Sequence, residues 1–167
     1  MNPSPLTNRR NLEFMLYEVL QADKLCAWPR FADHSRDTFA AALDLAHQIA
    51  LEKFLPHNRK SDLNEPHMVD GKVVLIPEIG EAVQAYNDAG FAAALADYEA
   101  GGMQLPFVIA QACDSMFSAA NPGTIAYPAL ARGASNLLAE YGTPEQKRLY
   151  MLPIIEGRYF GTMCLSE

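Results

Sequence analysis

The residue types that most often carry chemistry show no catalytic spacing in this sequence of 167 residues. The four histidines and three cysteines are scattered, without the short intervals that hold a metal ion. Asp97 and Glu99 flank a tyrosine, but two carboxylates in a glycine-containing turn are far more often solvated than paired for acid–base work. No glycine-rich phosphate loop follows a strand, and no serine stands in a nucleophile elbow. We therefore expect no metal site and no complete catalytic centre here.

A pattern that could bind a ligand lies in a helix predicted over residues 124–140. Ala126, Ala129 and Gly133 are spaced i, i+3 and i+7, so one helix face carries almost no side-chain volume. Either another helix packs closely there, or the face is a slot for an unbranched apolar ligand. The spacing leaves both interpretations open. The full apolar line predicts burial on more than one side, and it consists of Ile125, Ala126, Ala129, Leu130, Gly133, Leu137 and Leu138.

Helices must position this face, and the first of them lie in an N-terminal segment, residues 1–34. Apolar residues recur at helical spacing over 12–20, and a second short helix follows that Pro29 ends. Glu13 and Glu18 argue against a membrane-surface helix or a targeting peptide. We expect this segment to pack against the body of the protein or against a neighbouring subunit.

Capping signals delimit the next elements. Ser35 predicts the start of a helix that runs to about Leu55 and stops at Pro56, with a polar loop over 58–66. The Asp-Gly pair within 68–75 predicts a small hairpin. The remaining predictions are a helix from Pro77 to about Asn87, a loop over 97–106 that contains Gly101 and Gly102, and a helix that begins at Pro106.

The end of the chain combines a well-capped helix with a strand-like run. Gly142 predicts a helix end, and Thr143-Pro-Glu-Gln146 predicts a new helix with a capping box, interrupted at Pro153. Residues 159–165 favour a strand, whose backbone groups need neighbours. The strand could pair with the hairpin or be disordered. We favour a division into an extension (1–34), a helical domain (35–157) and the start of a middle β-domain (158–167) that continues in a longer protein.

Composition narrows the class of protein. The net charge of −7 makes nucleic acid and anionic membranes poor partners. Half of the residues are hydrophobic, yet no apolar run approaches the roughly 20 residues that a membrane span needs. An odd number of cysteines without paired spacing, and no signal peptide, predict reduced thiols in a cytoplasmic protein.

The segment from Tyr141 to Glu167 resembles the signature stretch of the acyl-CoA dehydrogenase family. The family pattern is Y/H-G-[ST]-x-E-Q-K, followed by a Leu-Pro, a Gly-Glu pair and a strand that ends in Thr-Glu-Pro. This chain departs from the pattern in two ways: the order of the Gly-Glu pair is reversed, and Ser166 replaces the threonine. The sequences Pro29-Arg-Phe-Ala-Asp, Leu55-Pro-His-Asn-Arg and Val69-Asp-Gly-Lys resemble a branch that carries an extra N-terminal segment. That branch includes 3-methylmercaptopropionyl-CoA dehydrogenase-like enzymes.

The resemblance implies an all-α antiparallel bundle that precedes a β-domain, and an FAD-dependent α,β-dehydrogenation of an acyl-CoA thioester. It implies that Met163, Leu165 and Ser166 contact the flavin, where an amide and a hydroxyl can hydrogen-bond N1 and O2. It also implies an acyl-chain pocket wall formed by Ile125, Ala126, Ala129, Leu130 and Gly133. The catalytic carboxylate is expected outside this stretch.

The same resemblance implies partners: an acyl-CoA substrate, an electron-transfer flavoprotein or another acceptor, and identical subunits in a homodimer or homotetramer. Residues 1–167 alone are expected to be inactive. The alternative is a non-catalytic helical scaffold or binding module of the same family, and its nucleic-acid-binding version is weakened by the acidity of the chain.

Overall fold

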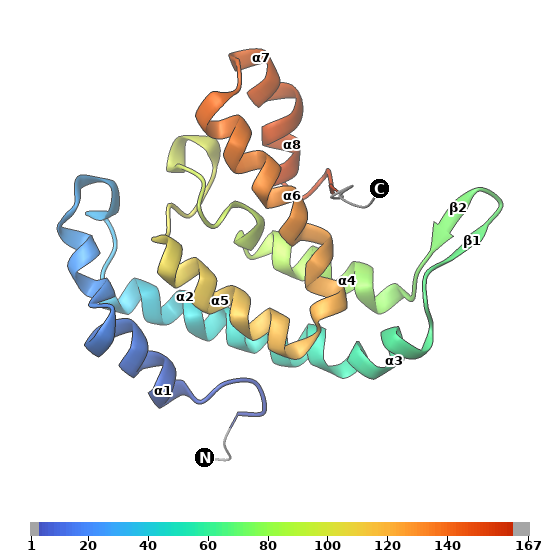
Figure 1. Cartoon of the computed structure of the whole chain (residues 1–167), viewed down its shortest axis with the longest axis horizontal. Coiled ribbons are helices and arrows are strands. Elements are labelled where there is room, and N and C mark those ends of the chain that lie inside the picture. The colour runs from blue at the N-terminus through green and yellow to red at the C-terminus, as the bar shows by residue number, and fades with distance from the viewer. Residues whose placement is uncertain (1–3, 162–167) are drawn as a thin grey trace, which may run out of the picture.

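Amphipathic helices build most of this chain, and a computed structural model describes them over residues 4–161 (Figure 1). The α-helices are α1 (Arg9–Glu13), α2 (Arg36–Ile49), α3 (Asn58–Leu63), α4 (Pro77–Asp88), α5 (Phe107–Ala120), α6 (Pro122–Tyr141), α7 (Pro144–Gln146) and α8 (Leu152–Ile155). The strands are β1 (His67–Val69) and β2 (Lys72–Val74). Stretches of π-helix cover Phe14–Val19, Ala50–Phe54 and Lys147–Met151, and 3-10 turns cover Ala22–Ala27, Pro29–Phe31, Leu55–His57, Phe91–Ala93 and Tyr98–Ala100. The predicted helical bundle with one hairpin is confirmed.

An aromatic cluster forms the centre of the core between α4 and α5. The Phe117 ring centroid lies 4.9 Å from those of Phe54 and Tyr86 and 5.2 Å from that of Phe91. All four side chains are buried. Tilted and edge-on aromatic pairs of this kind add about 0.5–1.5 kcal/mol each beyond their buried area. The cluster therefore holds α4, α5 and the end of the α2 segment against one another.

The N-terminal segment packs on α2, which confirms the first of the two predictions for it. Arg9 makes ion pairs of 2.8 Å with Glu13 on its own helix and with Asp44 on α2. The Arg36 guanidinium carbon lies 4.1 Å from the centroid of the Tyr17 ring, a distance typical of a cation–π contact. The segment is thus part of the bundle and extends the surface that α2 presents.

The helix that Ser35 caps is longer than predicted. The Ser35 side chain accepts a hydrogen bond from the Thr38 amide, as predicted. Pro56, however, does not end the helical path, because it lies in the first positions of a 3-10 turn, where no amide donor is needed. The chain continues directly into α3, so the loop predicted over 58–66 is wrong for Asn58–Leu63.

The hairpin and α4 follow their local sequence signals. His67 pairs with Val74, and Met68 with Val73, in an antiparallel register. Asp70 and Gly71 have φ of 49° and 74°, the conformation that the predicted tight turn requires. The hairpin projects from the bundle (Figure 1). The predicted helix α4 begins at Pro77.

The predicted loop over 97–106 folds back on the residues before it. The amides of Met103, Gln104 and Leu105 donate to the carbonyls of Ala93, Ala96 and Ala94, at distances of 3.1, 3.0 and 2.9 Å. Residues 103–105 of the loop therefore lie against residues 93–96, and the two segments form a compact double layer. Polar groups of the N-terminal segment hold its outer edge. The Gln104 side chain donates to the Arg30 carbonyl over 2.5 Å, and His34 Nε2 lies 3.1 Å from the Gln104 carbonyl oxygen.

Gly102 is the tightest point of this double layer, since a Cβ there would overlap the carbonyl oxygen of Ala96. We expect Gly102→Ala to lower the free energy of unfolding by about 3 kcal/mol, because backbone atoms cannot move aside cheaply. The matched control is Gly133→Ala on α6, where a Cβ meets nothing within 4 Å. It should raise stability by roughly 0.5–1 kcal/mol through helix propensity. Urea unfolding measures both values, and equal stability of the two variants would contradict the prediction.

The last helices confirm the predicted caps and correct one break. Thr143 caps α7 with the predicted capping box. Pro153 does not interrupt the helix, because it lies in the first turn of α8, where its missing amide is harmless. Gly157, with φ of 72°, follows the end of α8 and ends the helical path. Residues 159–161 are irregular, and the rest of the predicted strand lies outside the described residues. Between residues 4 and 161, no helix is long and apolar enough to cross a membrane.

Candidate functional site

Helix α6 carries the predicted ligand face, and its first turn is anchored to the segment before α3. The buried Asn121 side chain caps the helix by accepting a 3.0 Å hydrogen bond from the Thr124 amide. The buried His57 places Nε2 2.9 Å from the hydroxyl of Thr124. The His57 contact, together with a 3.4 Å hydrogen bond from the Asn121 amide to the Phe54 carbonyl, fixes the start of α6 on the bundle.

A buried polar triad of Tyr86, Asp114 and Arg132 holds the middle of α6. An Arg132 nitrogen lies 2.5 Å from a carboxylate oxygen of Asp114 on α5, and the two side chains are only 15% and 13% exposed. A second Arg132 nitrogen donates to the Tyr86 hydroxyl on α4 over 3.3 Å. That hydroxyl is 3.3 Å from Asp114 and 3.2 Å from the Phe91 carbonyl, and it donates its proton to one of these oxygens. One side chain of α6 is thus bonded to both neighbouring helices.

Tyr86 and Arg132 each keep one protonation state around neutral pH. Burial raises the pKa of Tyr86 above its ordinary value, so the hydroxyl stays protonated. Burial opposes the Arg132 cation, but the hydrogen bond and charge of Asp114 outweigh it and raise the guanidinium pKa. Burial also raises the pKa of Cys113, the neighbour of Asp114, to about 12. The Cys113 thiol is therefore no nucleophile at neutral pH.

The opposite side of α6 is open. Ala126 and Gly133 are exposed, Ala129 is half-buried, and Leu130 is 42% exposed. We refer to these four residues as the open face of α6. Ile125, predicted to belong to the same wall, is instead only 6% exposed and part of the core. The prediction that α6 is buried on more than one side is wrong for the described chain, since its buried residues all lie on one side: Thr124, Ile125, Pro128, Ala131 and Ser135.

The two interpretations of the small residues can be compared with this geometry. A helix packed closely on the open face would bring atoms near Gly133. Within residues 4–161, nothing lies within 4 Å of a Cβ built there. The described part of the chain therefore leaves this face free for a ligand or for another part of the protein.

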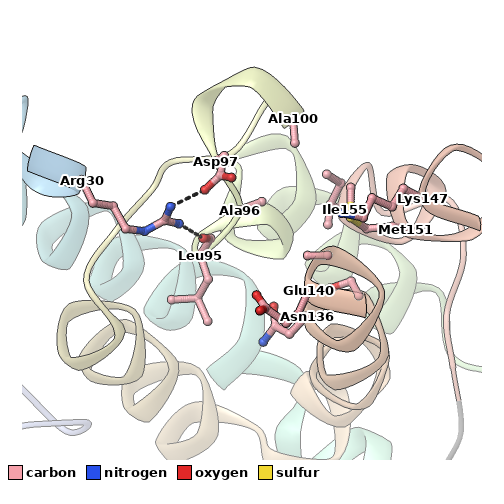
Figure 2. A pocket seen from close by; sticks show the side chains of 12 residues that line it. Arg30, Leu95, Ala96, Asp97, Ala100, Asn136, Glu140, Lys147, Met151 and Ile155 are labelled. Carbon is pink, nitrogen blue, oxygen red and sulfur yellow. Dashed lines mark hydrogen bonds and ion pairs between the residues drawn. The ribbon is translucent and has the colours of Figure 1, made fainter. Parts of the chain in front are cut away.

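Several hollows lie elsewhere on the surface of the described chain, and none of the predicted wall residues lines either of the two larger ones below. The first, of about 410 Å³, lies between the segment Leu95–Ala100 and the end of α6 (Figure 2). On one side Arg30 holds Asp97 at 2.5 Å and the Leu95 carbonyl at 3.2 Å. Asp97, predicted to be merely solvated, is therefore ion-paired, although both groups are about half exposed. Figure 2 shows Asn136 and Glu140 across the hollow from this pair.

The second hollow, of about 420 Å³, lies between α4 and α6 and is mostly apolar. Ile79, Val83, Tyr127 and Phe160 contribute to its wall. Neither hollow brings together a base and a nucleophile. Among residues 4–161, no three His, Cys, Asp or Glu side chains gather as a metal site would require.

The predicted flavin contacts Met163, Leu165 and Ser166 lie outside the described residues. The segment that leads to them is described as far as Gly161. It passes beside α6, where a Cβ built on Gly161 would lie 3.4 Å from the Cα of Ala131. The chain thus leaves α8 next to the helix that carries the open face.

Sequence reasoning missed Asp114 and Arg132, although a signal was present. Helix α5 contains one charged residue, Asp114, and α6 contains only Arg132 and Glu140. A single acidic residue and a single central basic residue in two adjoining apolar helices favour a buried pair.

The comparisons with known proteins agree on one family. The model of the acyl-CoA dehydrogenase N-terminal domain matches residues 37–158. The chain is 28% identical over 158 residues to 3-methylmercaptopropionyl-CoA dehydrogenase of Ruegeria pomeroyi, covering 95% of the chain and 27% of that protein. It is 31% identical over 166 residues to the broad-specificity linear acyl-CoA dehydrogenase FadE5 of Mycobacterium tuberculosis, covering 96% of the chain and 26% of that protein.

A third relative is butyryl-CoA dehydrogenase of Syntrophomonas wolfei, with 26% identity over 168 residues, 97% of the chain and 27% of that protein. The chain thus spans about a quarter of the length of these relatives. The family match covers most of the helical bundle, including α2 through α8, the open face and the triad. By this match and by its fold, the chain belongs to the acyl-CoA dehydrogenase family, whose N-terminal domain it contains.

Proposed function

We propose that this chain serves an FAD-dependent enzyme that dehydrogenates an acyl-CoA thioester between its α and β carbons. In this enzyme residues 1–34 are an extension, 35–157 the helical domain, and 158–167 the start of a β-domain. The observation that carries the proposal is the open face of α6. A helix anchored on its buried side presents small apolar residues on the other, as a wall for an apolar chain requires.

The open face contributes a binding surface for the acyl chain, and other groups carry out the chemical steps. Ala126, Ala129 and Gly133 leave room along the helix, and Leu130 adds apolar surface beside them. An unbranched acyl chain fits such a shallow track better than a branched one, because branches need width that a single helix face does not offer. The wall binds and orients the substrate, excludes water from its apolar part, and moves no proton.

We assign Met163, Leu165 and Ser166 to one edge of the flavin site. The hydrogen-bond donors of these residues are consistent with this assignment. Backbone amides and a serine hydroxyl can donate to N1 and O2 of a flavin ring, and serine retains the hydroxyl of the family's threonine. FAD, when bound, supplies the hydride acceptor for the reaction.

The remaining parts of the proposal follow from the family. The substrate is an acyl-CoA, electrons leave to an electron-transfer flavoprotein or another acceptor, and the protein acts as a homodimer or homotetramer in the cytoplasm. The names of three relatives specify a methylthio-substituted acyl group, linear acyl groups and a butyryl group. They support an acyl-CoA substrate class without choosing a chain length.

An acyl-CoA panel tests the proposal on the intact enzyme. With an electron-transfer dye under nitrogen, we expect dye reduction by straight-chain acyl-CoA esters and enrichment of the 2-enoyl product. Repeating the assay in air separates a dehydrogenase from an oxidase. Residues 1–167 expressed alone should bind no FAD and show no turnover, so a yellow fragment would contradict the proposed division of the site. Failure of every acyl-CoA would favour the non-catalytic scaffold.

A further inference from the structure

We propose that Arg132 is a positioning residue: through Asp114 and Tyr86 it fixes the rotation of α6, and thereby the track that the open face offers to the acyl chain. The inference rests on the proposed function. Arg132 is given no contact with the substrate, because its side chain is bonded to α4 and α5 on the side of α6 away from the open face. Its role would be to set which side chains of α6 face the acyl chain, and where each of them lies along the track.

The need for such a residue comes from Pro128, which lies inside α6. Proline has no amide hydrogen, so the carbonyl of Thr124 lacks its helical partner and the helix is weakened there. Ala126 precedes this point, whereas Leu130 and Gly133 follow it. The two halves of the open face can therefore change their relative orientation unless a tertiary contact fixes the second half.

Arg132 supplies that contact one helical turn after Pro128. Apolar packing around α6 is largely non-directional, whereas a guanidinium presents its donors in a fixed plane. The Arg132 fork reaches Asp114 on α5 at 2.5 Å and Tyr86 on α4 at 3.3 Å. Because the two side chains of the ion pair are mostly buried, water competes little for these donors. Two bonds to two different helices determine the rotation of α6 as one bond could not.

The orientation of α6 matters because Gly133 directly follows Arg132 on the helix. A rotation of roughly 25° would move a Cα atom of the open face by about 1 Å, given the radius of an α-helix. Displacements of about 1 Å are enough to change catalytic rates by as much as ~100-fold. A long acyl chain contacts more of the face than a short one, so a rotated helix should affect long substrates more.

The test uses the intact enzyme and the ratio of kcat/KM for dodecanoyl-CoA to that for butyryl-CoA. Arg132→Lys keeps the charge but cannot bond Asp114 and Tyr86 with one planar fork. The double variant Asp114→Leu/Arg132→Met replaces the ion pair by apolar side chains, a change that buried pairs often tolerate in stability. We expect both to lower the ratio at least fivefold, mainly through KM for the long substrate, and Tyr86→Phe to lower it less.

Leu43→Ala on α2 is the control for destabilisation, since it removes buried core volume and leaves all three side chains of the triad in place. Its ratio should equal that of the wild type, although its melting temperature falls. An unchanged ratio in both Arg132→Lys and the double variant would overturn the inference while leaving the proposed function intact. A ratio that falls equally in Leu43→Ala would overturn it too. Absence of turnover in the wild type would instead overturn the proposed function, and the inference with it.

Discussion

Replacing Asp114 alone with leucine is expected to lower the free energy of unfolding by about 3–5 kcal/mol. The change leaves the Arg132 guanidinium without its anion in a place where it is 15% exposed. The cation loses its charge-assisted hydrogen bond and gains no water in exchange. Within the triad, Arg132 then has the Tyr86 hydroxyl, 3.3 Å away, as its remaining hydrogen-bond partner. A neutral hydroxyl oxygen does not replace a carboxylate as the partner of a cation.

Urea unfolding followed by circular dichroism measures this loss. The double variant Asp114→Leu/Arg132→Met should recover most of it, because no charge then remains in the core. Glu156→Gln, which removes one partner of an exposed ion pair with Arg158, should change stability by no more than about 1 kcal/mol. If Asp114→Leu resembled Glu156→Gln, the pair would not be buried in solution in the way that the structure describes.

Filling the open face is expected to have the second large effect. Ala129→Leu places a branched side chain in the middle of the proposed acyl track, between Ala126 and Gly133. In the intact enzyme we expect kcat/KM for long acyl-CoA substrates to fall by about 10- to 200-fold, the range that one or a few misplaced methylene groups produce in an apolar pocket. Butyryl-CoA should be affected much less, because a short chain ends before it reaches the obstruction or passes beside it.

The matched control for Ala129→Leu is Ala119→Leu on the exposed side of α5, which adds the same volume away from the open face. It should leave the chain-length profile unchanged. Thermal unfolding of both variants shows whether the fold tolerates the added volume. An equal loss across all chain lengths for Ala129→Leu would favour close packing of another helix on this face over an acyl slot.

Several elements followed directly from short-range signals. Ser35 caps its helix as its residue type predicts, Thr143 and Gln146 form the predicted capping box, and Asp70-Gly71 forms the tight turn of the hairpin. Each depends on hydrogen bonds or φ angles within a few residues, so no distant part of the chain can overrule it easily.

Two errors arose at prolines, where the winding of the preceding helical turn decides the outcome. Pro56 and Pro153 both predicted helix ends, yet each lies at the start of a new helical turn, where the missing amide has no cost. The sequence indicates that proline lacks a donor, but whether that donor is needed depends on how the preceding turn is wound. Here π-helical stretches precede both turns and shift the position of the proline.

The sequence by itself determined the helical class, most caps, the family and the grouping of Ala126, Ala129 and Gly133 on one face of α6. Helical periodicity settles which residues share a face, because it depends only on their spacing. The tertiary structure alone decided that this face is open within the described chain, and that Ile125 is turned into the core. It also brought Arg132 to Asp114 and Tyr86, an assembly that requires both α4 and α5 to pack on the same side of α6.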